Sequence, residues 1–385
     1  MTDRVSQIDY GMFIMPFHAP SKPLAQGYDE DLELIVRAEE LGFKEFWIGE
    51  HHTMKYETIV MPEIFIARAL GETNRIRLGP APVCLNQHHP AHVASRLAFL
   101  DHLAKGRLNL CFGNGSVTAD QELYGVDPKD GGAMALEAID VILKLWSTDP
   151  PYEHNGRFWQ FKLRDNVDPE SLIGFIHRPL QQPHPPISMP GMSRDSFSMK
   201  FAGQRGYQPF AHCLVTGNVV ADMWQTYANA AQAAGRIPQR SDFKVSRSIF
   251  LADTTKEAVA KARANSLGQN YEYIGRLFDK GLGRRIYKRD LGMPNSECNL
   301  DFLMTEQIIA GDVDEVLRRL LQLIEETGTF GTLVLMSYDW DDKASWVHSM
   351  ELFAKELMPA LNRAVCGVTT NGKVRGQVVQ SSILP

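Results

Sequence analysis

The chain has 385 residues, of which 44% are hydrophobic and 22% charged, and its formal net charge is -6. This composition is typical of a folded globular protein and excludes a disordered chain. The acidic balance and the lack of basic blocks interleaved with aromatic residues argue against nucleic-acid binding. No apolar run approaches the roughly 20 residues that a membrane span requires, so we expect no membrane segment.

The five cysteines are far apart in the sequence and form no CxxC pair. This spacing predicts neither a disulfide framework nor a zinc cluster, and it suits a reducing compartment. The first ten residues lack the basic region and apolar stretch of a secretion signal. We therefore expect a cytoplasmic protein.

The first elements alternate between strand and helix. Residues 10–15 are predicted to form a strand and residues 29–41 a helix, because Leu34, Ala38 and Leu41 repeat at helical spacing. Gly42 is a natural stop for this helix, and the apolar residues 45–49 follow as a second strand. The alternation continues with a helix at 62–70, a strand at 76–83, a helix at 91–104 and a strand at 107–112.

Four further strands are predicted at residues 186–190, 207–213, 245–251 and 331–337, with helical patterns between most of them. Apolar strands separated by crossover helices indicate a parallel sheet whose outer face is covered. Eight such strands predict an α/β fold in which the sheet closes into a (β/α)8 TIM barrel.

Two stretches interrupt this alternation. Residues 151–185 are rich in proline and aromatic residues and follow strand four, whereas residues 267–300 are rich in glycine and arginine and follow strand seven. Long excursions of this kind are often lids or subunit contacts, and plain surface insertions fit equally well. We predict one barrel domain over residues 1–363 with these two insertions, followed by a C-terminal extension at 364–385.

Histidines gather after several predicted strands. His51 and His52 follow strand two, His88 and His89 follow strand three, and His212 ends strand six. Because catalytic groups of such barrels lie on the loops after the strands, these side chains are expected at one mouth. The HExxH pattern is absent and adjacent histidines rarely ligate one ion, so we predict no metal site.

Two other polar patterns have the composition of anion sites. Gly191, Ser193 and Ser196 precede a helical pattern at 197–204, and hydroxyl groups with free N–H groups at a helix start can bind an anion, although serine there is usually only a cap. A basic cluster made of Arg284, Arg285, Lys288 and Arg289 is interpreted as a solvated surface.

An ordered series of motifs resembles the luciferase-like flavin monooxygenases. It comprises Gly49-Glu50-His51-His52, Arg75-Ile76-Arg77-Leu78-Gly79, His89-Pro90, residues 100–108, Gly113-Asn114-Gly115, residues 180–187, Ala202-Gly203-Gln204-Arg205-Gly206 and residues 311–316. Their order and spacing match the family from Tyr10 to about Leu361. The long segment 191–198 is similar to that of limonene and diketocamphane monooxygenases rather than to that of the light-emitting enzymes.

The resemblance implies roles for particular residues. His51 matches the family histidine that supports the reaction of reduced flavin with oxygen and stabilises the peroxyflavin, as a base or a hydrogen-bond donor. A histidine pKa near neutrality would suit such proton exchange. Asn114 stands where luciferases carry an arginine that touches the flavin ring, and Ala81-Pro82 falls where they have a cis peptide beneath it. We predict a cis Ala81–Pro82 bond, since cis bonds before proline cost far less than others.

The remaining site residues form two groups. The turn with Met192, Ser193 and Ser196 matches the region that receives the FMN phosphate, and completes a cofactor set with Ala81, Pro82 and Asn114. Residues expected around the substrate are Met15, Phe17, His18, Leu85 and His212.

The function implied by the resemblance is that of a two-component monooxygenase. Reduced FMN and O2 would form a C4a-peroxyflavin that hydroxylates, epoxidises or Baeyer–Villiger oxidises a small, mostly apolar substrate. No GxGxxG motif follows a strand, so a separate NAD(P)H:flavin reductase is expected to supply the reduced FMN. The family also implies a homodimer that pairs through the helices beside strands two and three.

Two alternatives remain at this stage. One is a reductase or dehydrogenase that uses the deazaflavin F420 on the same barrel. The other is a non-catalytic flavin-binding protein.

Overall fold

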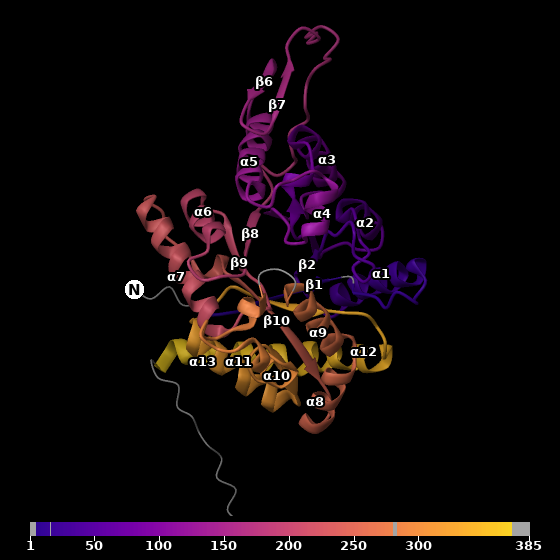
Figure 1. Cartoon of the computed structure of the whole chain (residues 1–385), viewed down its shortest axis with the longest axis vertical. Helices are drawn as coiled ribbons and strands as arrows, with labels where there is room; N and C mark the ends of the chain where they lie inside the picture. Colours follow the sequence, from indigo (N-terminus) through magenta and orange to yellow (C-terminus); the bar gives the residue numbers. More distant parts are fainter. Residues whose placement is uncertain (1–4, 16, 280–282, 372–385) are drawn as a thin grey trace, which may run out of the picture.

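The structure is a computed structural model that describes residues 5–15, 17–279 and 283–371. Its centre is a barrel of parallel strands with helices packed around it (Figure 1). The barrel strands are β1 (Asp9–Ile14), β2 (Glu45–Ile48), β3 (Arg77–Pro80), β4 (Val83–Cys84), β5 (Leu110–Gly113), β8 (Ile187–Gly191), β9 (Gln208–Ala211), β10 (Lys244–Leu251) and β12 (Thr332–Ser337).

Neighbouring strands pair in the order β3-β2-β1-β12-β10-β9-β8-β5-β4. β3 and β4 are two pieces of one barrel position, separated by Ala81 and Pro82. The ring closes where Leu78 of β3 forms a parallel bridge to Leu108, close to the start of β5. The predicted (β/α)8 barrel is therefore confirmed.

One further parallel strand, beside the barrel, was not predicted. β11 (Ile308–Gly311) pairs in parallel with the end of β10, with Ser248 opposite Ile308. Its run of three apolar residues is too short to show a period, so the sequence pattern indicated only a turn before the next helix.

The helices on the outside of the barrel follow the strands in sequence. They are α1 (Leu24–Glu40), α2 (Pro62–Ala69), α3 (Pro90–Leu103), α4 (Thr118–Leu123), α5 (Gly131–Ser147), α6 (Phe197–Arg205), α7 (Gly217–Ala233), α8 (Thr255–Ala264), α9 (Ser266–Asp279), α10 (Leu300–Glu306), α11 (Val313–Thr327), α12 (Lys343–Leu352) and α13 (Met358–Asn371).

Helix α1 begins at Leu24, five residues before the predicted start at residue 29. Its first turns contain Gly27, which by intrinsic propensity disfavours a helix. A Cβ atom on Gly27 would lie 3.0 Å from Cδ2 of His18, so this glycine lets the helix approach the histidine ring. Tertiary contact thus lengthens the helix beyond what its local sequence predicts.

The first insertion projects from the barrel as a β-hairpin (Figure 1). Its strands β6 (Tyr152–Asn155) and β7 (Gln160–Leu163) are antiparallel and lie within the predicted stretch 151–185. Glu137 on α5 accepts hydrogen bonds from the backbone N–H groups of Phe158 and Trp159, at 3.2 and 3.0 Å. These bonds hold the turn of the hairpin against α5.

The second insertion lies beside the C-terminal ends of the barrel strands. It contains α9 and two short 3-10 helices, η3 (Gly283–Tyr287) and η4 (Asn295–Glu297). Side chains of this insertion line the same cavity as the strand ends, as described below.

A charged pair crosses the inside of the barrel at the opposite end. Glu45 and Lys244 are the first residues of β2 and β10, and Lys244 Nζ lies 2.8 Å from Glu45 Oε2 with both side chains 8% exposed. Trp47 Nε1 and Asn109 Nδ2 also donate to the Glu45 carboxylate, at 2.9 and 3.3 Å. The carboxylate is therefore fully engaged by three polar partners from three parts of the barrel.

The C-terminal part of the chain departs from the prediction. The extension was predicted to begin at residue 364, but α13 continues through it to Asn371, and Val365 is buried against the core. The remainder of the predicted extension, residues 372–385, lies outside the described residues. Within the described part of the chain, no helix combines the length and apolar character needed to cross a membrane.

Candidate active site

A cavity of about 820 Å³ opens at the C-terminal ends of the barrel strands. Residues of β1, β4, β5, β8, β9 and β10 line it, together with the loop after β2, Ala81, Pro82, the start of α5 and the second insertion. Apolar side chains on its walls include Phe13, Met15, Phe112, Ile139, Met189 and Phe210. The volume lies within the range of about 300–1,000 Å³ that small-molecule sites occupy.

Most of the residues predicted from the sequence come together in this cavity. Its lining includes Met15, His51, Ala81, Pro82, Asn114, Met192, Ser193, Ser196 and His212. The Ala81–Pro82 peptide is cis, which confirms that prediction. Phe17, His18 and Leu85 are not among the lining residues.

Phe17 and Leu85 are buried outside the cavity lining. Phe17 stacks on Tyr56 with ring centroids 4.9 Å apart, and its backbone forms a bridge with Glu57. This bridge draws Phe17 toward the loop after β2. Leu85 lies in a 3-10 turn and is fully buried, because β4 ends at Cys84 and the chain turns away from the mouth. The predicted substrate contacts of both residues therefore do not fit the structure.

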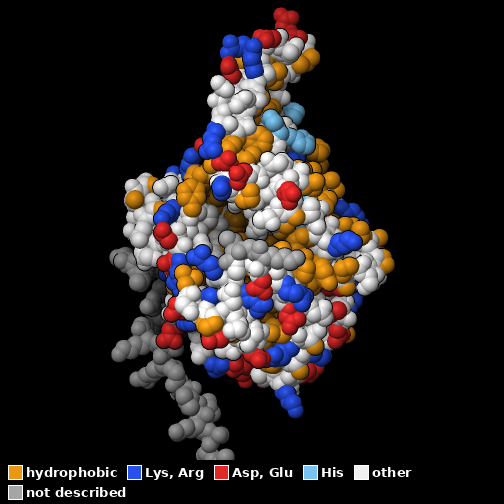
Figure 2. Space-filling model, viewed as in Figure 1, with side chains coloured by type: hydrophobic (Ala, Val, Ile, Leu, Met, Phe, Trp, Pro, Cys, Tyr) orange, Lys and Arg blue, Asp and Glu red, His pale blue; other side chains and the backbone are white. Residues whose placement is uncertain are grey.

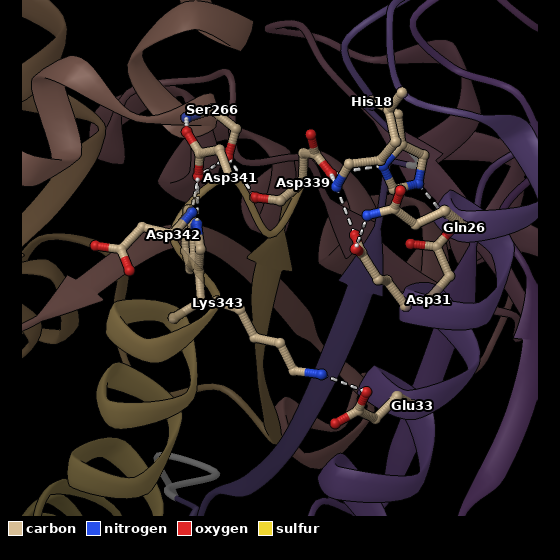
Figure 3. A network of polar contacts seen from close by, with 12 residues as sticks. His18, Gln26, Asp31, Glu33, Ser266, Asp339, Asp341, Asp342 and Lys343 are labelled. Carbon is tan, nitrogen blue, oxygen red and sulfur yellow. Dashed lines mark hydrogen bonds and ion pairs between the residues drawn. The ribbon is translucent and has the colours of Figure 1, made fainter.

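His18 lies in a buried polar network rather than at the cavity (Figure 3). Its Nδ1 is 2.8 Å from Oδ1 of Asp339, which follows β12, and its Nε2 is 3.0 Å from Oδ2 of Asp31 on α1. Burial lowers the pKa of His18, but hydrogen bonds to Asp31 and Asp339 outweigh burial and raise it to about 9. The protonated ring ties the loop after β1 to the loop after β12, which corrects its predicted role as a substrate contact.

His51 is held between two carboxylates from different loops. Its Nε2 lies 2.9 Å from Glu57 Oε2, and its Nδ1 lies 3.6 Å from Asp120 Oδ2. Asp120, on α4, is itself fixed by the backbone N–H of Thr53 at 2.8 Å. Within the described residues, Nδ1 of His51 has no hydrogen-bond acceptor.

These carboxylates set the charge of His51. Burial lowers its pKa, but the negative charges of Glu57 and Asp120 outweigh burial and raise it to about 10. The expectation of a pKa near neutrality is therefore wrong, and the ring is an imidazolium across the physiological pH range. Glu57 and Asp120 were not singled out in the sequence, because neither position follows a recognisable pattern and only folding brings them to His51.

Among the residues that the structure describes, two groups of side chains have the composition of metal ligands. In one, Glu50 Oε1 accepts from His52 Nε2 at 3.0 Å and from His88 Nε2 at 2.6 Å. Burial raises the pKa of Glu50, but these hydrogen bonds outweigh it and hold the pKa at about 2, so the carboxylate is ionised and already accepts hydrogen bonds from both rings. In the other group, Lys22 Nζ binds both Glu30 and Asp339 and supplies the positive charge.

His212 differs from His51 in its charge. Its Nδ1 accepts the backbone N–H of Leu214 at 3.3 Å, so the neutral ring carries its proton on Nε2. Burial lowers the pKa of His212 to about 4, and the charge of Arg247 acts in the same direction. The cavity therefore contains one charged and one neutral histidine.

Two cations of the basic cluster also line the cavity. Arg285 and Lys288 are part of its lining, whereas the sequence pattern suggested a solvated surface. Lys288 is only 9% exposed. Helical periodicity could not predict that these two side chains face the cavity, because the segment consists of 3-10 turns and irregular chain.

Comparison with known proteins agrees with this geometry. The sequence profile of the luciferase-like monooxygenases matches residues 8–329. The chain belongs to this family. A 4-hydroxyprotoasukamycin monooxygenase of Streptomyces nodosus subsp. asukaensis is 32% identical over 372 residues, which cover 95% of this chain and 96% of that protein.

Two relatives bear out the resemblance to terpenoid-oxidising members of the family. A limonene 1,2-monooxygenase of Rhodococcus erythropolis is 29% identical over 94% of this chain and 89% of its own length. The oxygenating constituent of 3,6-diketocamphane monooxygenase from Pseudomonas putida, a type II Baeyer–Villiger monooxygenase solved with FMN, superposes with a TM-score of 0.82. That structure is 29% identical and covers 92% of this chain and 98% of its own.

Proposed function

We propose that this chain is the oxygenase of a two-component monooxygenase that uses reduced FMN and O2 to oxidise a small, mostly apolar substrate. The observation that carries the proposal is the apolar cavity at the strand ends with His51 on its wall. Members of the luciferase-like monooxygenase family provide the precedent, including the relative solved with FMN.

The cavity has the features needed to hold FMN. Gly113 lets β5 approach the cis Ala81–Pro82 unit, since a Cβ atom there would lie 2.9 Å from the Pro82 ring. Asn114 follows on the same wall. At another wall the turn with Met192, Ser193 and Ser196 leads into α6, whose start offers unpaired N–H groups and a partial positive charge to a phosphate.

Reduced FMN, when bound, would supply the electrons that activate O2, and O2 would supply the oxygen atom that is transferred. His51, as an imidazolium, would donate a hydrogen bond to negative charge that develops on oxygen. The apolar walls around Phe13, Met189 and Phe210 would exclude water from that charge. His212 and Met15 would face the substrate, with the Nε2–H of His212 as a neutral donor.

We propose a separate NAD(P)H:flavin reductase as partner. The chain has no GxGxxG motif after a strand, and the relative from Pseudomonas putida is described as one constituent of its enzyme. A reductase that depends on NAD(P)H places the pair in the cytoplasm in this proposal.

We also propose a homodimer that pairs through α2 and α3. Ile64 on α2 is 68% exposed, and Phe99 and Leu103 on α3 are 64% and 47% exposed. Hydrophobic side chains are also numerous on this side of the molecule in Figure 2. Contiguous exposed apolar residues are typical of interfaces between subunits.

Replacing Phe99 and Ile64 by aspartate should convert the dimer into a monomer, because four charges would be buried in a two-fold interface. Light scattering coupled to size-exclusion chromatography measures the mass. Ile237, which is 82% exposed before β10, provides a control when replaced by aspartate. A wild-type chain that elutes as a monomer at micromolar concentration contradicts the proposed dimer.

Two experiments test the function: the first measures flavin binding, and the second measures oxidation of a substrate. We expect fluorescence titration to detect binding of FMN but not of F420. We then expect reductase-supplied reduced FMN under ¹⁸O₂ to place one ¹⁸O atom in a product from a panel of cyclic ketones, terpenes and nitrogen heterocycles. Binding of F420 in place of FMN would point to the deazaflavin alternative, and FMN binding without any labelled product would point to a non-catalytic flavin protein.

A further inference from the structure

The four cationic side chains of the segment that begins at η3 fall into two pairs: one pair binds acidic residues, and the other lines the cavity. Arg284 pairs with Asp279 at 2.9 Å, and Arg289 pairs with Glu306 at 3.0 Å and with Glu326. Arg285 and Lys288 instead line the cavity. Neither has an ion pair or side-chain hydrogen bond with any residue that the structure describes.

Lys288 is the more unusual of these two. The residue is only 9% exposed and lines the cavity, yet no described carboxylate pairs with it. A buried charge is costly unless an opposite charge compensates it. An anionic ligand in the cavity can supply the negative partner that the described residues do not.

The segment is fixed next to the turn that leads into α6. Arg194, in that turn, donates from Nη2 to the backbone oxygen of Arg289 at 3.0 Å, and Asn218 donates from Nδ2 to the same oxygen at 3.0 Å. Ser193 and Ser196 of the turn line the cavity together with Lys288. The Oγ of Ser196 makes no capping bond to α6, so the N–H groups at the start of this nine-residue helix lack a side-chain acceptor.

We propose that Lys288 binds the phosphate of the flavin, so that the second insertion supplies the cation while α6 supplies the N–H groups. Arg285 also lines the cavity but is exposed, so Lys288 is the better shielded of the two cations. The inference rests on the proposed function, because it needs a flavin phosphate in the cavity. It assigns a binding role to a segment outside the barrel strands.

The test compares FMN with riboflavin, which lacks the phosphate. Lys288→Gln should weaken FMN binding about 10- to 100-fold, the range expected when a charged hydrogen bond is lost, and should leave riboflavin affinity unchanged. Lys288→Arg should retain most of the affinity for FMN. Arg289→Gln is the matched control, because it removes a cation of the same segment whose side chain is 46% exposed and paired outside the cavity.

Flavin fluorescence titrations at two salt concentrations measure these affinities, and thermal melting checks that each variant is folded. The wild-type preference for FMN over riboflavin should fall as salt rises, and this salt dependence should shrink in Lys288→Gln. Equal losses for FMN and riboflavin, or an unchanged ratio, would overturn the role of Lys288. Failure of the wild-type chain to bind either flavin would instead overturn the proposed function.

Discussion

Replacing His51 by asparagine should lower the oxygenated product formed per reduced FMN by about 10²- to 10⁴-fold, the usual contribution of a positioned proton donor. The reason is geometric and electrostatic. The ring lines the cavity and is kept charged by Glu57 and Asp120, so its loss removes a charged hydrogen-bond donor from the cavity wall. Oxygen uptake should persist, with hydrogen peroxide as its product.

The measurement is the ratio of product to hydrogen peroxide in a reductase-coupled assay. His89→Asn is a matched control, because His89 caps α3 through a bond from the Ala91 N–H and asparagine is also a good cap. FMN affinity should change little in His51→Asn. Wild-type coupling in His51→Asn would show that the histidine does not act on oxygen.

The pH profile follows from the same contacts. The folded-state pKa of His51 is raised to about 10, so the ring stays protonated below that value and loses its charge as pH rises through it. Coupling should therefore be flat from pH 6 to pH 9 and fall near pH 10. Asp120→Asn removes one of the charges that raise this pKa, so the alkaline fall should move to lower pH. A profile that instead rises through pH 7 would indicate a neutral histidine acting as a base.

Replacing Lys244 by methionine should destabilise the barrel by about 3–5 kcal/mol, the typical cost of leaving one partner of a buried ion pair alone. Glu45 is 8% exposed, and its Oε2 loses the ammonium group 2.8 Å away. Trp47 and Asn109 would remain as donors, but they cannot neutralise the charge. Urea unfolding followed by tryptophan fluorescence and circular dichroism measures the loss.

The double variant Lys244→Met with Glu45→Gln distinguishes the loss of charge pairing from the loss of side-chain packing. It removes both charges, so it should recover a large part of the lost free energy of unfolding, because a neutral amide can still accept from Trp47. A loss below 1 kcal/mol in Lys244→Met alone would mean that water reaches the pair. Equal losses in the single and double variants would assign the effect to packing instead of charge.

The barrel and the general place of the site follow from the amino-acid pattern alone. Apolar strands that alternate with helices can pack only as a covered parallel sheet, and the loops after such strands meet at one mouth. This is why His51, Asn114 and Ser196, which are far apart in the chain, were correctly expected in one place. The cis Ala81–Pro82 bond could also be predicted from the sequence, because the free-energy cost of a cis peptide bond is small before proline.

Which loop side chains face the cavity, and what charge they carry, depends on contacts that form in the folded chain. His18 and Phe17 follow the same strand as Met15, yet they turn away toward Asp339 and Tyr56. The pKa of His51 depends on carboxylates from two other segments, and Lys288 reaches the cavity from an insertion without a regular period. Periodicity in a sequence records burial within one element, whereas these properties arise from contacts between irregular segments that local sequence does not encode.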